Sequence, residues 1–329
     1  MTEAPFADGR MRLTVLGGYL GSGKTTWLRH QLHVGIFGPV HVVVNEAAET
    51  AVDDALLSGA AGLTLLAGGC SCCVGRADLI AALRSLCDQR SRIPASALRL
   101  QRIVLETSGL ADPGAIVAAI QTDPILVNHI VIDETIVVVD ALHGLAQLTT
   151  EALGRRQIGA ADRLILSKVD AADPSALTAL RATLRGLGPG AVQSGAILGE
   201  PVTLPDLPAD AAALPLAPLD EDDIRGALFP ARLTIDADID WSAFAMWLSA
   251  LLHARGDDLV RVKGVIRTPA GRLLLQTVRK VVQSPEILPE QGESRDDGTI
   301  VFIGRGFRPE DLRKSLRRFA GKTSTEGYR

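Results

Sequence analysis

The sequence MRLTVLGGYLGSGKTTWLRHQL, residues 11–32, joins an apolar run, a glycine-rich loop and a helix-like stretch. The pattern G-x-x-x-x-G-K-[ST], in which backbone N–H groups surround phosphate oxygens, is satisfied by Gly18, Gly23, Lys24 and Thr25. In this pattern the lysine reaches the β- and γ-phosphates, and the Ser/Thr hydroxyl binds Mg²⁺. A turn that only joins a strand to a helix is the alternative, and the strand, loop and helix in this order disfavour it. We predict a nucleotide-binding loop with the candidate ligands Gly18, Gly21, Ser22, Gly23, Lys24, Thr25 and Thr26.

Outward from this loop, apolar runs of strand length alternate with helix-like stretches. The expected strands are residues 12–16, 40–44, 103–105, 135–139 and 163–166. The expected helices are residues 25–32, 75–87, 112–120, 152–159 and 174–187. Such alternation predicts a parallel sheet with helical crossovers. The fold class is therefore α/β, a P-loop NTPase whose mainly parallel sheet is flanked by helices.

A change of composition divides the chain. The stretch EPVTLPDLPADAAALPLAPLDEDD, residues 200–223, is rich in proline, alanine and acidic residues, which is typical of a linker. Beyond it, one helical face is formed by Trp241, Phe244, Ala245, Leu248 and Leu252, and strands are expected at residues 259–266 and 273–278. A further helix is expected from Pro309. We expect a nucleotide-binding domain over residues 1–198, a linker over 199–227 and a smaller α+β domain over 228–329.

Composition and charge exclude several classes of protein. The chain has 329 residues, 47% of them hydrophobic, and a formal net charge of −4. This charge gives no field that would draw the protein to nucleic acid or to an anionic membrane. An apolar leader at the N-terminus and any run of eighteen apolar residues are both missing from the sequence, so a cytoplasmic location is expected.

The motif SKVD, residues 167–170, follows an expected strand, and ligands of open α/β sheets bind at the carboxyl ends of strands. Asp170 is able to accept two N–H bonds from the guanine edge while the stem of Lys168 lies along the ring. Adenine cannot return this pairing, so guanine is preferred. The alternative is an ordinary turn that carries a lysine and an aspartate.

Hydrolysis of a nucleotide requires a carboxylate near Mg²⁺ and the γ-phosphate. Two strand ends supply one: Glu106 in IVLETSG and Asp140 in TIVVVD. The residue types alone do not decide between them. Gly109 would let the backbone approach a γ-phosphate, so the stretch ETSGLADP is expected to respond to the nucleotide.

The stretch GGCSCC, residues 68–73, holds three of the four cysteines of the chain. In a reducing compartment this favours metal or redox chemistry over disulfides. Thiolates from Cys70, Cys72 and Cys73 in one loop suit a soft or borderline ion such as Zn²⁺, Co²⁺ or Cu⁺. Because the chain has no second cysteine pair, we expect an open site with Glu46 or water as the fourth ligand. A redox pair and a chance cluster are the alternatives, and the fourth cysteine, Cys87, is expected to be a buried helix residue.

Taken together, GGYLGSGKTT, GGCSCC, ETSGLADP and SKVD resemble the CobW-like branch of the CobW/HypB/UreG family of metal-handling GTPases, and RVKG (261–264) and VFIGRG (301–306) are similar to the C-terminal domain of that family. The resemblance implies that Lys24 binds phosphate, Thr25 binds Mg²⁺ and Glu106 lies beside both. It also implies that Lys168 and Asp170 bind guanine. The chain departs from the family pattern at Ser167, where the family prefers Asn, and at Ala47-Ala48, where NEAAETAVDD is similar to a switch segment with Phe-Gly.

The resemblance implies a GTP-dependent metallochaperone that binds zinc, or else cobalt or iron, through the cysteines. Its cofactors would be GTP, Mg²⁺ and Zn²⁺ (or Co²⁺), and its partner a client metalloprotein or a metal-cofactor assembly enzyme. Hydrolysis should be slow, because no arginine finger is identifiable in the sequence. Nucleic acid and membrane partners are not expected, and a homodimer is possible. An enzyme with its own small substrate, or a regulatory module that senses metal or nucleotide, remain alternatives.

Overall fold

A computed structural model describes residues 9–46, 60–67, 73–94, 99–218, 229–235, 239–256, 258–278, 281–282, 286–288 and 298–319. The chain separates into two compact units, Met1–Ile224 and Arg225–Arg329. Among the described residues, no helix combines the length and the apolar character that crossing a membrane requires.

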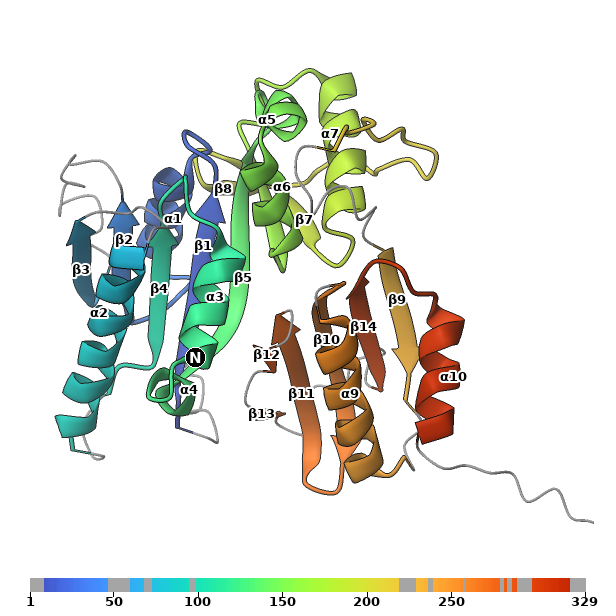
Figure 1. The fold of residues 1–329 in the computed structure, drawn as a ribbon. Coiled ribbons are helices and arrows are strands. Elements are labelled where there is room, and N and C mark those ends of the chain that lie inside the picture. Colours follow the sequence, from blue (N-terminus) through green and yellow to red (C-terminus); the bar gives the residue numbers. More distant parts are fainter. Residues whose placement is uncertain are drawn as a thin grey trace, which may run out of the picture. The chain divides into compact units, whose positions relative to one another are not determined.

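The first unit is built on an eight-stranded sheet with the order β3-β2-β4-β1-β5-β6-β7-β8 (Figure 1). Neighbouring strands are parallel except for the pair formed by β7 and β8. The strands are β1 Met11–Gly18, β2 Val40–Glu46, β3 Gly62–Ala67, β4 Arg102–Thr107, β5 Ile130–Asp140, β6 Arg163–Ser167, β7 Val192–Ile197 and β8 Glu200–Val202. The parallel sheet confirms the predicted fold class.

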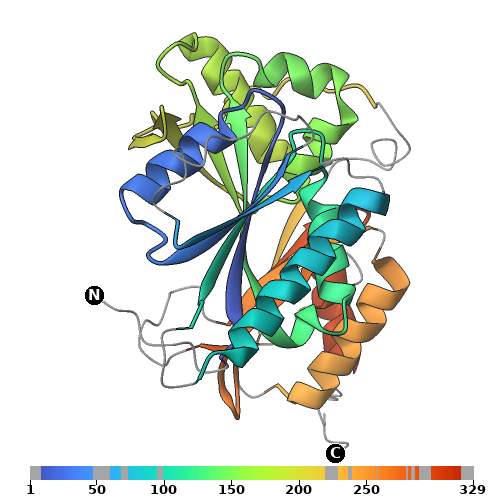
Figure 2. The same cartoon turned by 90° about the vertical axis from the view of Figure 1, so that its left-hand side faces the viewer.

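Helices cover both faces of this sheet. They are α1 Lys24–His33, α2 Cys73–Arg92, α3 Pro113–Thr122, α4 Leu126–His129, α5 Gly144–Thr150, α6 Ala152–Gly159 and α7 Pro174–Leu187. Trp27 and Leu28 of α1 pack on one face, whereas Leu148 of α5, Ile158 of α6 and Leu180 of α7 pack on the other. Viewed along the sheet, α1 lies on one side and α2 with α3 on the opposite side (Figure 2). Ligands of such sheets bind at the carboxyl ends of the parallel strands.

Several helix starts follow directly from the sequence. Asp112, Asp173 and Asp240 each precede a helix, and each side chain accepts hydrogen bonds from backbone N–H groups of the first turn. Such caps satisfy donors that have no partner within the helix. Pro113 and Pro174 occupy first positions, where a missing N–H costs nothing.

Strand β5 and the expected linker are among the parts of the first unit that differ from the sequence-based expectation. Strand β5 begins at Ile130, five residues before the expected start. The charged pair Asp133-Glu134 interrupts the apolar pattern of this strand, and this interruption hides its first half in the sequence. The register shifts at this point, and Asp133 accepts a hydrogen bond from Arg12 at 2.7 Å. In addition, residues 200–202 of the expected linker form β8, which pairs with β7.

The second unit is a small α+β fold, as expected. Its antiparallel sheet has the order β12-β11-β10-β14-β9, with β13 paired to β11. The elements are β9 Phe229–Thr234, α9 Trp241–Arg255, β10 Leu259–Thr268, β11 Gly271–Val278, β12 Val281–Val282, β13 Glu286–Leu288, β14 Thr299–Gly304 and α10 Pro309–Phe319. Phe244, Trp247 and Phe302 are buried at the centre of its core. The indole N–H of Trp247 donates to Ser315 Oγ at 3.0 Å and so connects α9 to α10.

Candidate nucleotide site

The loop between β1 and α1 has the shape of a phosphate cradle. Its backbone requires glycine at two points: a Cβ on Gly18 would lie 2.3 Å from the carbonyl oxygen of Val138, and Gly23 has a φ of 89°. Gly23 is the N-cap of α1 and provides no side chain to cap it. The first N–H groups of this helix therefore remain available to an anion, and the helix dipole favours negative charge there.

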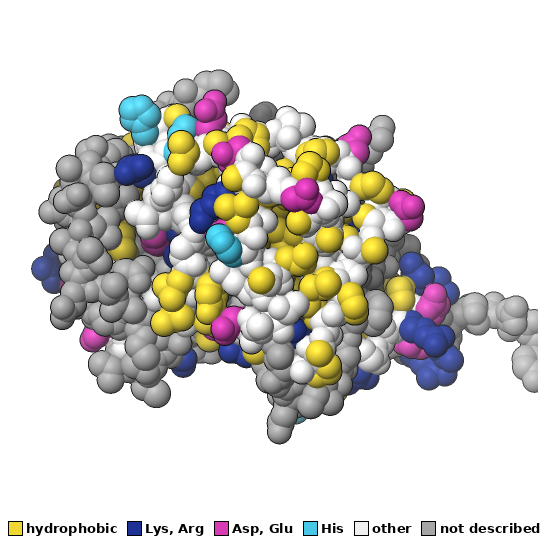
Figure 3. Space-filling view, turned by 90° about the horizontal axis from the view of Figure 1, so that it is seen from above, with side chains coloured by type: hydrophobic (Ala, Val, Ile, Leu, Met, Phe, Trp, Pro, Cys, Tyr) yellow, Lys and Arg dark blue, Asp and Glu magenta, His cyan; other side chains and the backbone are white. Residues whose placement is uncertain are grey.

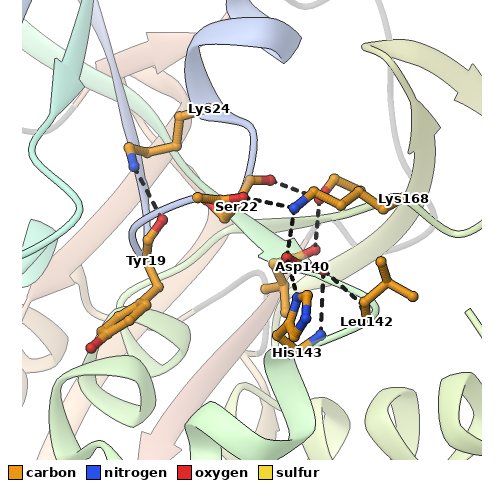
Figure 4. A network of polar contacts seen from close by, with 10 residues as sticks. Tyr19, Ser22, Lys24, Asp140, Leu142, His143 and Lys168 are labelled. Atoms are coloured by element: carbon orange, nitrogen blue, oxygen red, sulfur yellow. Dashed lines mark hydrogen bonds and ion pairs between the residues drawn. The ribbon is translucent and has the colours of Figure 1, made fainter. Parts of the chain in front are cut away.

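Lys24 is the first residue of α1, and its side chain is almost completely buried. Its ammonium group donates to the carbonyl oxygen of Tyr19 at 3.2 Å, so it folds back over its own loop (Figure 4). A lysine in this position can exchange a loop carbonyl for phosphate oxygens without moving its helix.

Thr25 of α1 contacts Glu106 near the end of β4. The Thr25 hydroxyl donates to Glu106 Oε1 at 2.5 Å, and Glu106 is 1% exposed. Glu106 is paired with Leu16 across β4 and β1, so the sheet itself places the carboxylate beside the phosphate loop. A hydroxyl and a carboxylate are the hard oxygen ligands that Mg²⁺ prefers, so this pair of residues fits that ion.

The segment ETSGLADP, residues 106–113, lies directly against the phosphate loop. A Cβ on Gly109 would come within 2.7 Å of the Leu20 backbone nitrogen. Gly109 is thus needed for the close approach of two backbone segments, which adds a packing reason to the predicted approach to phosphate.

The motif SKVD forms the opposite wall of the loop. Lys168 has a φ of 57°, and its ammonium group donates to the carbonyl oxygen of Gly21 at 2.9 Å and to Asp140 Oδ2 at 2.7 Å (Figure 4). Ser167 Oγ donates to the carbonyl oxygen of Ser22 at 2.7 Å. Asp170 is exposed. Lys168 and Ser167 therefore connect the end of β6 to the phosphate loop.

Asp140 belongs to this wall and not to the Thr25 side of the loop. It is 3% exposed and accepts hydrogen bonds from Lys168, from His143 Nδ1 at 3.0 Å and from the Leu142 N–H at 2.8 Å. Burial raises the pKa of Asp140, but the hydrogen bonds from Lys168, His143 and Leu142 and the charge of Lys168 outweigh it, so the pKa lies below its usual value. The carboxylate is thereby held in its ionised form.

Sequence reasoning missed three residues of this region. His143 completes the network around Asp140, while Glu151 and Gln157 of the α6 region contact Tyr19 and the ETSGLADP segment. None of them belongs to a motif. No local signal marks them, because α6 follows both segments that it contacts, the phosphate loop and ETSGLADP, far along the chain.

The thiol site lies mostly outside the described residues. Cys70 and Cys72 are not described, and neither are the side chains of Cys73 and Glu46. The backbone is described on both sides: Glu46 ends β2 and is paired with Ala67, which ends β3 three residues before Cys70. Cys73 is the first residue of α2, which begins two residues before the expected start. The fourth cysteine, Cys87, is buried in α2 as expected, and burial raises the pKa of its thiol to about 11.

The carboxyl edge of the sheet brings four strand ends into one row. Because the strand order is β3-β2-β4-β1, the end of β3 at Ala67 is followed by the end of β2 at Glu46, by Glu106 of β4 and by the phosphate loop after β1. Figure 3 looks onto the molecule from above, and here hydrophobic side chains are interspersed with a few charged ones. The described part of the chain contains no group of three or more His, Cys, Asp or Glu side chains that could hold a metal ion.

Comparison with known proteins identifies this arrangement. Residues 12–193 match the family described as CobW/HypB/UreG, nucleotide-binding domain. The chain belongs to the CobW/HypB/UreG family. Residues 231–320 match a second family, the cobalamin synthesis protein cobW C-terminal domain. Both matches confirm the resemblance inferred from the motifs.

Individual relatives extend over different parts of the chain. The zinc chaperone YjiA of Escherichia coli is 29% identical over 94% of this chain and 98% of its own length. The zinc-regulated GTPase metalloprotein activator 1 of Schizosaccharomyces pombe is 32% identical over 52% of this chain and 42% of its own. The crystal structure of Zn(II)-bound YjiA GTPase from E. coli superposes with a TM-score of 0.60 at 25% identity, covering 94% of this chain and 99% of that one.

Proposed function

We propose that this protein is a GTP-dependent metallochaperone that takes up zinc through Cys70, Cys72 and Cys73, with Glu46 as a further ligand, and passes it to a client protein. The order of the strands supports this proposal, because the end of β3, three residues before Cys70, and the phosphate loop lie on one edge of the sheet with the ends of β2 and β4 between them. Relatives with the names zinc chaperone and GTPase support the choice of cargo and nucleotide.

In the proposed reaction the residues around the phosphates act from the loop between β1 and α1, from the first turn of α1 and from the end of β4. Lys24 leaves the Tyr19 carbonyl and neutralises the β- and γ-phosphate oxygens of GTP. Thr25 and Glu106 would hold Mg²⁺, which when bound supplies charge neutralisation between the two phosphates. Backbone groups of Gly18, Gly21, Ser22, Gly23 and Thr26 surround the phosphates, and Gly109 brings the ETSGLADP segment to the terminal one.

On the base side, Asp170 accepts the two N–H bonds of guanine and Lys168 lies along the ring. Ser167 lacks the amide of the asparagine that the family prefers, but its hydroxyl donates to the Ser22 carbonyl and so connects the SKVD segment to the phosphate loop. We therefore expect preference for guanine in spite of this departure from the family pattern.

Loss of the terminal phosphate would release ETSGLADP from the nucleotide, because contacts to that phosphate order such segments. Glu46 is next to this segment through the β2 and β4 pairing, in which Asn45 lies opposite Thr107. Hydrolysis would then loosen the ligand that β2 supplies to zinc. The ion becomes available to a metalloprotein or to a metal-cofactor assembly enzyme.

Zinc transfer tests this function directly. Purified protein loaded with Zn²⁺ and GTP is mixed with a fluorescent zinc chelator, and zinc release is followed together with phosphate release. We expect the two to proceed at the same rate, and we expect Cys72→Ser to hydrolyse GTP without carrying zinc. Cys87→Ser is the matched control and should behave as the wild type. Equal zinc loading of wild type and Cys72→Ser would contradict the proposal.

A further inference from the structure

Helix α6 contacts the nucleotide-responsive segment through a buried amide. Gln157 is 1% exposed, and its Nε2 donates to the carbonyl oxygens of Gly109 at 3.3 Å and Ala111 at 2.8 Å. Both donors of this amide are thus used on the backbone of ETSGLADP. A buried amide has no water to bond in place of these two carbonyls, so breaking the contact would leave its N–H donors without partners. The contact therefore holds the carbonyls of Gly109 and Ala111 in place.

Arg156, the residue before Gln157, adds an ion pair between α6 and the end of ETSGLADP. Arg156 lies 3.6 Å from the carboxylate of Asp112, which caps α3. A Cβ on Gly114, in the first turn of α3, would lie 3.4 Å from the Cβ of Ala160. ETSGLADP and the helix that follows it, α3, are therefore both packed against α6.

A third contact of α6 reaches the phosphate loop. Glu151, the N-cap of α6, forms a side-chain hydrogen bond with Tyr19. The Tyr19 carbonyl is the group that receives the Lys24 ammonium. Tyr19 therefore contacts both Lys24 and the start of α6, so a movement of Lys24 on nucleotide binding would occur next to a residue that α6 contacts.

The opposite side of α6 contacts the segment that leads toward the second unit. Arg155 is 6% exposed, and its guanidinium donates to the carbonyl oxygens of Leu148 at 2.7 Å and Ala217 at 2.6 Å. Ala217 lies within the proline- and alanine-rich stretch, only a few residues before the end of the first unit at Ile224. Gln157 and Arg155 are two residues apart on one short helix, so a shift of this helix moves both sets of contacts.

We propose that Gln157 is a positioning residue for GTP hydrolysis, and that α6 transmits the nucleotide state from ETSGLADP to the connecting segment at Ala217. Gln157 fixes the carbonyls of Gly109 and Ala111 so that the remaining groups of the segment face the terminal phosphate. When that phosphate is lost and the segment relaxes, α6 follows the two carbonyls, and the Arg155 contact with Ala217 changes with it. This inference rests on the proposed GTPase function and names its positioning residue and its output.

Substitution of Gln157 separates positioning from general stability. Gln157→Leu removes both donors at similar volume, and we expect kcat for GTP hydrolysis to fall about tenfold or more while the Kd for GDP changes by less than about twofold. Gln157→Glu places a carboxylate oxygen against two carbonyls, and its kcat should recover relative to wild type as the pH falls, because the protonated carboxyl regains an O–H donor.

The control is a similar amide in a remote place. Gln193 Nε2 donates to the carbonyl oxygen of Arg181 at 3.0 Å and so connects β7 to α7. Gln193→Leu should lower the melting temperature as Gln157→Leu does, but should leave kcat unchanged. A parallel loss of kcat and GDP affinity in Gln157→Leu, or a kcat equal to that of Gln193→Leu, overturns the positioning role.

Amide hydrogen exchange of the connecting segment tests the transmission. In the wild type, exchange within residues 203–218 should differ between GDP and a non-hydrolysable GTP analogue, and Arg155→Met and Gln157→Leu should abolish this difference. Gln193→Leu should retain it. Identical exchange of wild-type protein in the two nucleotide states overturns the coupling. Since none of these measurements involves zinc, failure of the metallochaperone proposal would leave their outcome unaffected and would be recognised separately.

Discussion

At the scale of single residues, the base side of the site depends on the ion pair between Lys168 and Asp140. The carboxylate is buried while Lys168 is 40% exposed, so solvent screens part of the interaction. Lys168 also holds the Gly21 carbonyl, so the pair fixes the phosphate loop and the predicted guanine wall together. Loss of the carboxylate would leave the ammonium without its buried partner.

Asp140→Asn should therefore weaken binding of guanine nucleotides. We expect the Kd for GDP to rise about tenfold, which corresponds to about 1.4 kcal/mol, and the preference for GDP over ADP to fall. Titration calorimetry with both nucleotides measures this. Asp133→Asn is the control. Asp133 lies elsewhere on β5 and forms a 2.7 Å ion pair with Arg12 of β1, so its substitution should leave both affinities unchanged. Unaltered GDP affinity in Asp140→Asn would refute the role of the pair.

The same carboxylate predicts a dependence of stability on pH. Its pKa in the folded protein lies below the unfolded value of about 3.9, so below that value the unfolded state binds more protons than the folded state. The stability that Asp140 contributes is fully present above about pH 4 to 5 and is lost as the pH falls through the lower folded pKa. The melting temperature of wild type should exceed that of Asp140→Asn near neutral pH, and the gap should narrow below about pH 4. A constant gap would argue against this linkage.

At the scale of elements, the close packing of ETSGLADP on the phosphate loop predicts the effect of Gly109→Ala. The added Cβ would meet the Leu20 backbone at 2.7 Å, and backbone cannot yield as a flexible side chain does. We expect a loss of about 1–3 kcal/mol in stability and weaker nucleotide binding, measured by thermal unfolding with and without GDP.

Gly186→Ala is the matched control for this substitution. Gly186 lies within α7, and a Cβ there meets nothing within 4 Å. Alanine should stabilise this helix by up to about 1 kcal/mol. If Gly109→Ala is as harmless as Gly186→Ala, the close approach of the two segments is not important for folding or binding.

The elements also explain which parts of the fold the sequence could predict. The bounds of α6 and α7 agree with the expected ones, and for α7 an aspartate cap followed by proline marks the start locally. Strand β7, VQSGAI, was not expected, because polar residues and glycine hide its pattern and its pairing with β6 is a long-range property.

The candidate site divides in the same way. The phosphate loop is a local motif, so its place between β1 and α1 could be predicted from the sequence, and its role in binding phosphate stays a prediction. The ion pair of Asp140 with Lys168 and the contacts of Gln157 join residues 28 and 46 to 48 positions apart, and only the fold brings them together. For that reason the sequence left the choice between Glu106 and Asp140 open, whereas in the structure Glu106 is the one that contacts Thr25.

At the scale of the whole molecule, the four cysteines should differ in reactivity. Cys87 is buried and has a pKa of about 11, so it is protonated at neutral pH and should resist alkylation in the native protein. The cluster Cys70, Cys72 and Cys73 should react with iodoacetamide in the absence of metal and should be protected by Zn²⁺. Mass spectrometry of the labelled peptides measures both. Rapid labelling of Cys87, or labelling of the cluster that Zn²⁺ does not slow, would contradict the assignment.

The nucleotide and the zinc ion should influence one another across the edge formed by β3, β2, β4 and β1. Coupling between two sites requires that the affinity for one ligand differ between the two states of the other. The most direct measurement is the Kd for Zn²⁺ of the wild-type protein with Mg²⁺ and a non-hydrolysable GTP analogue, compared with the Kd in the presence of Mg²⁺ and GDP. We expect zinc to bind about tenfold more tightly in the GTP-like state, which is within the usual range of coupling between sites. Equal zinc affinities in the two states would contradict it.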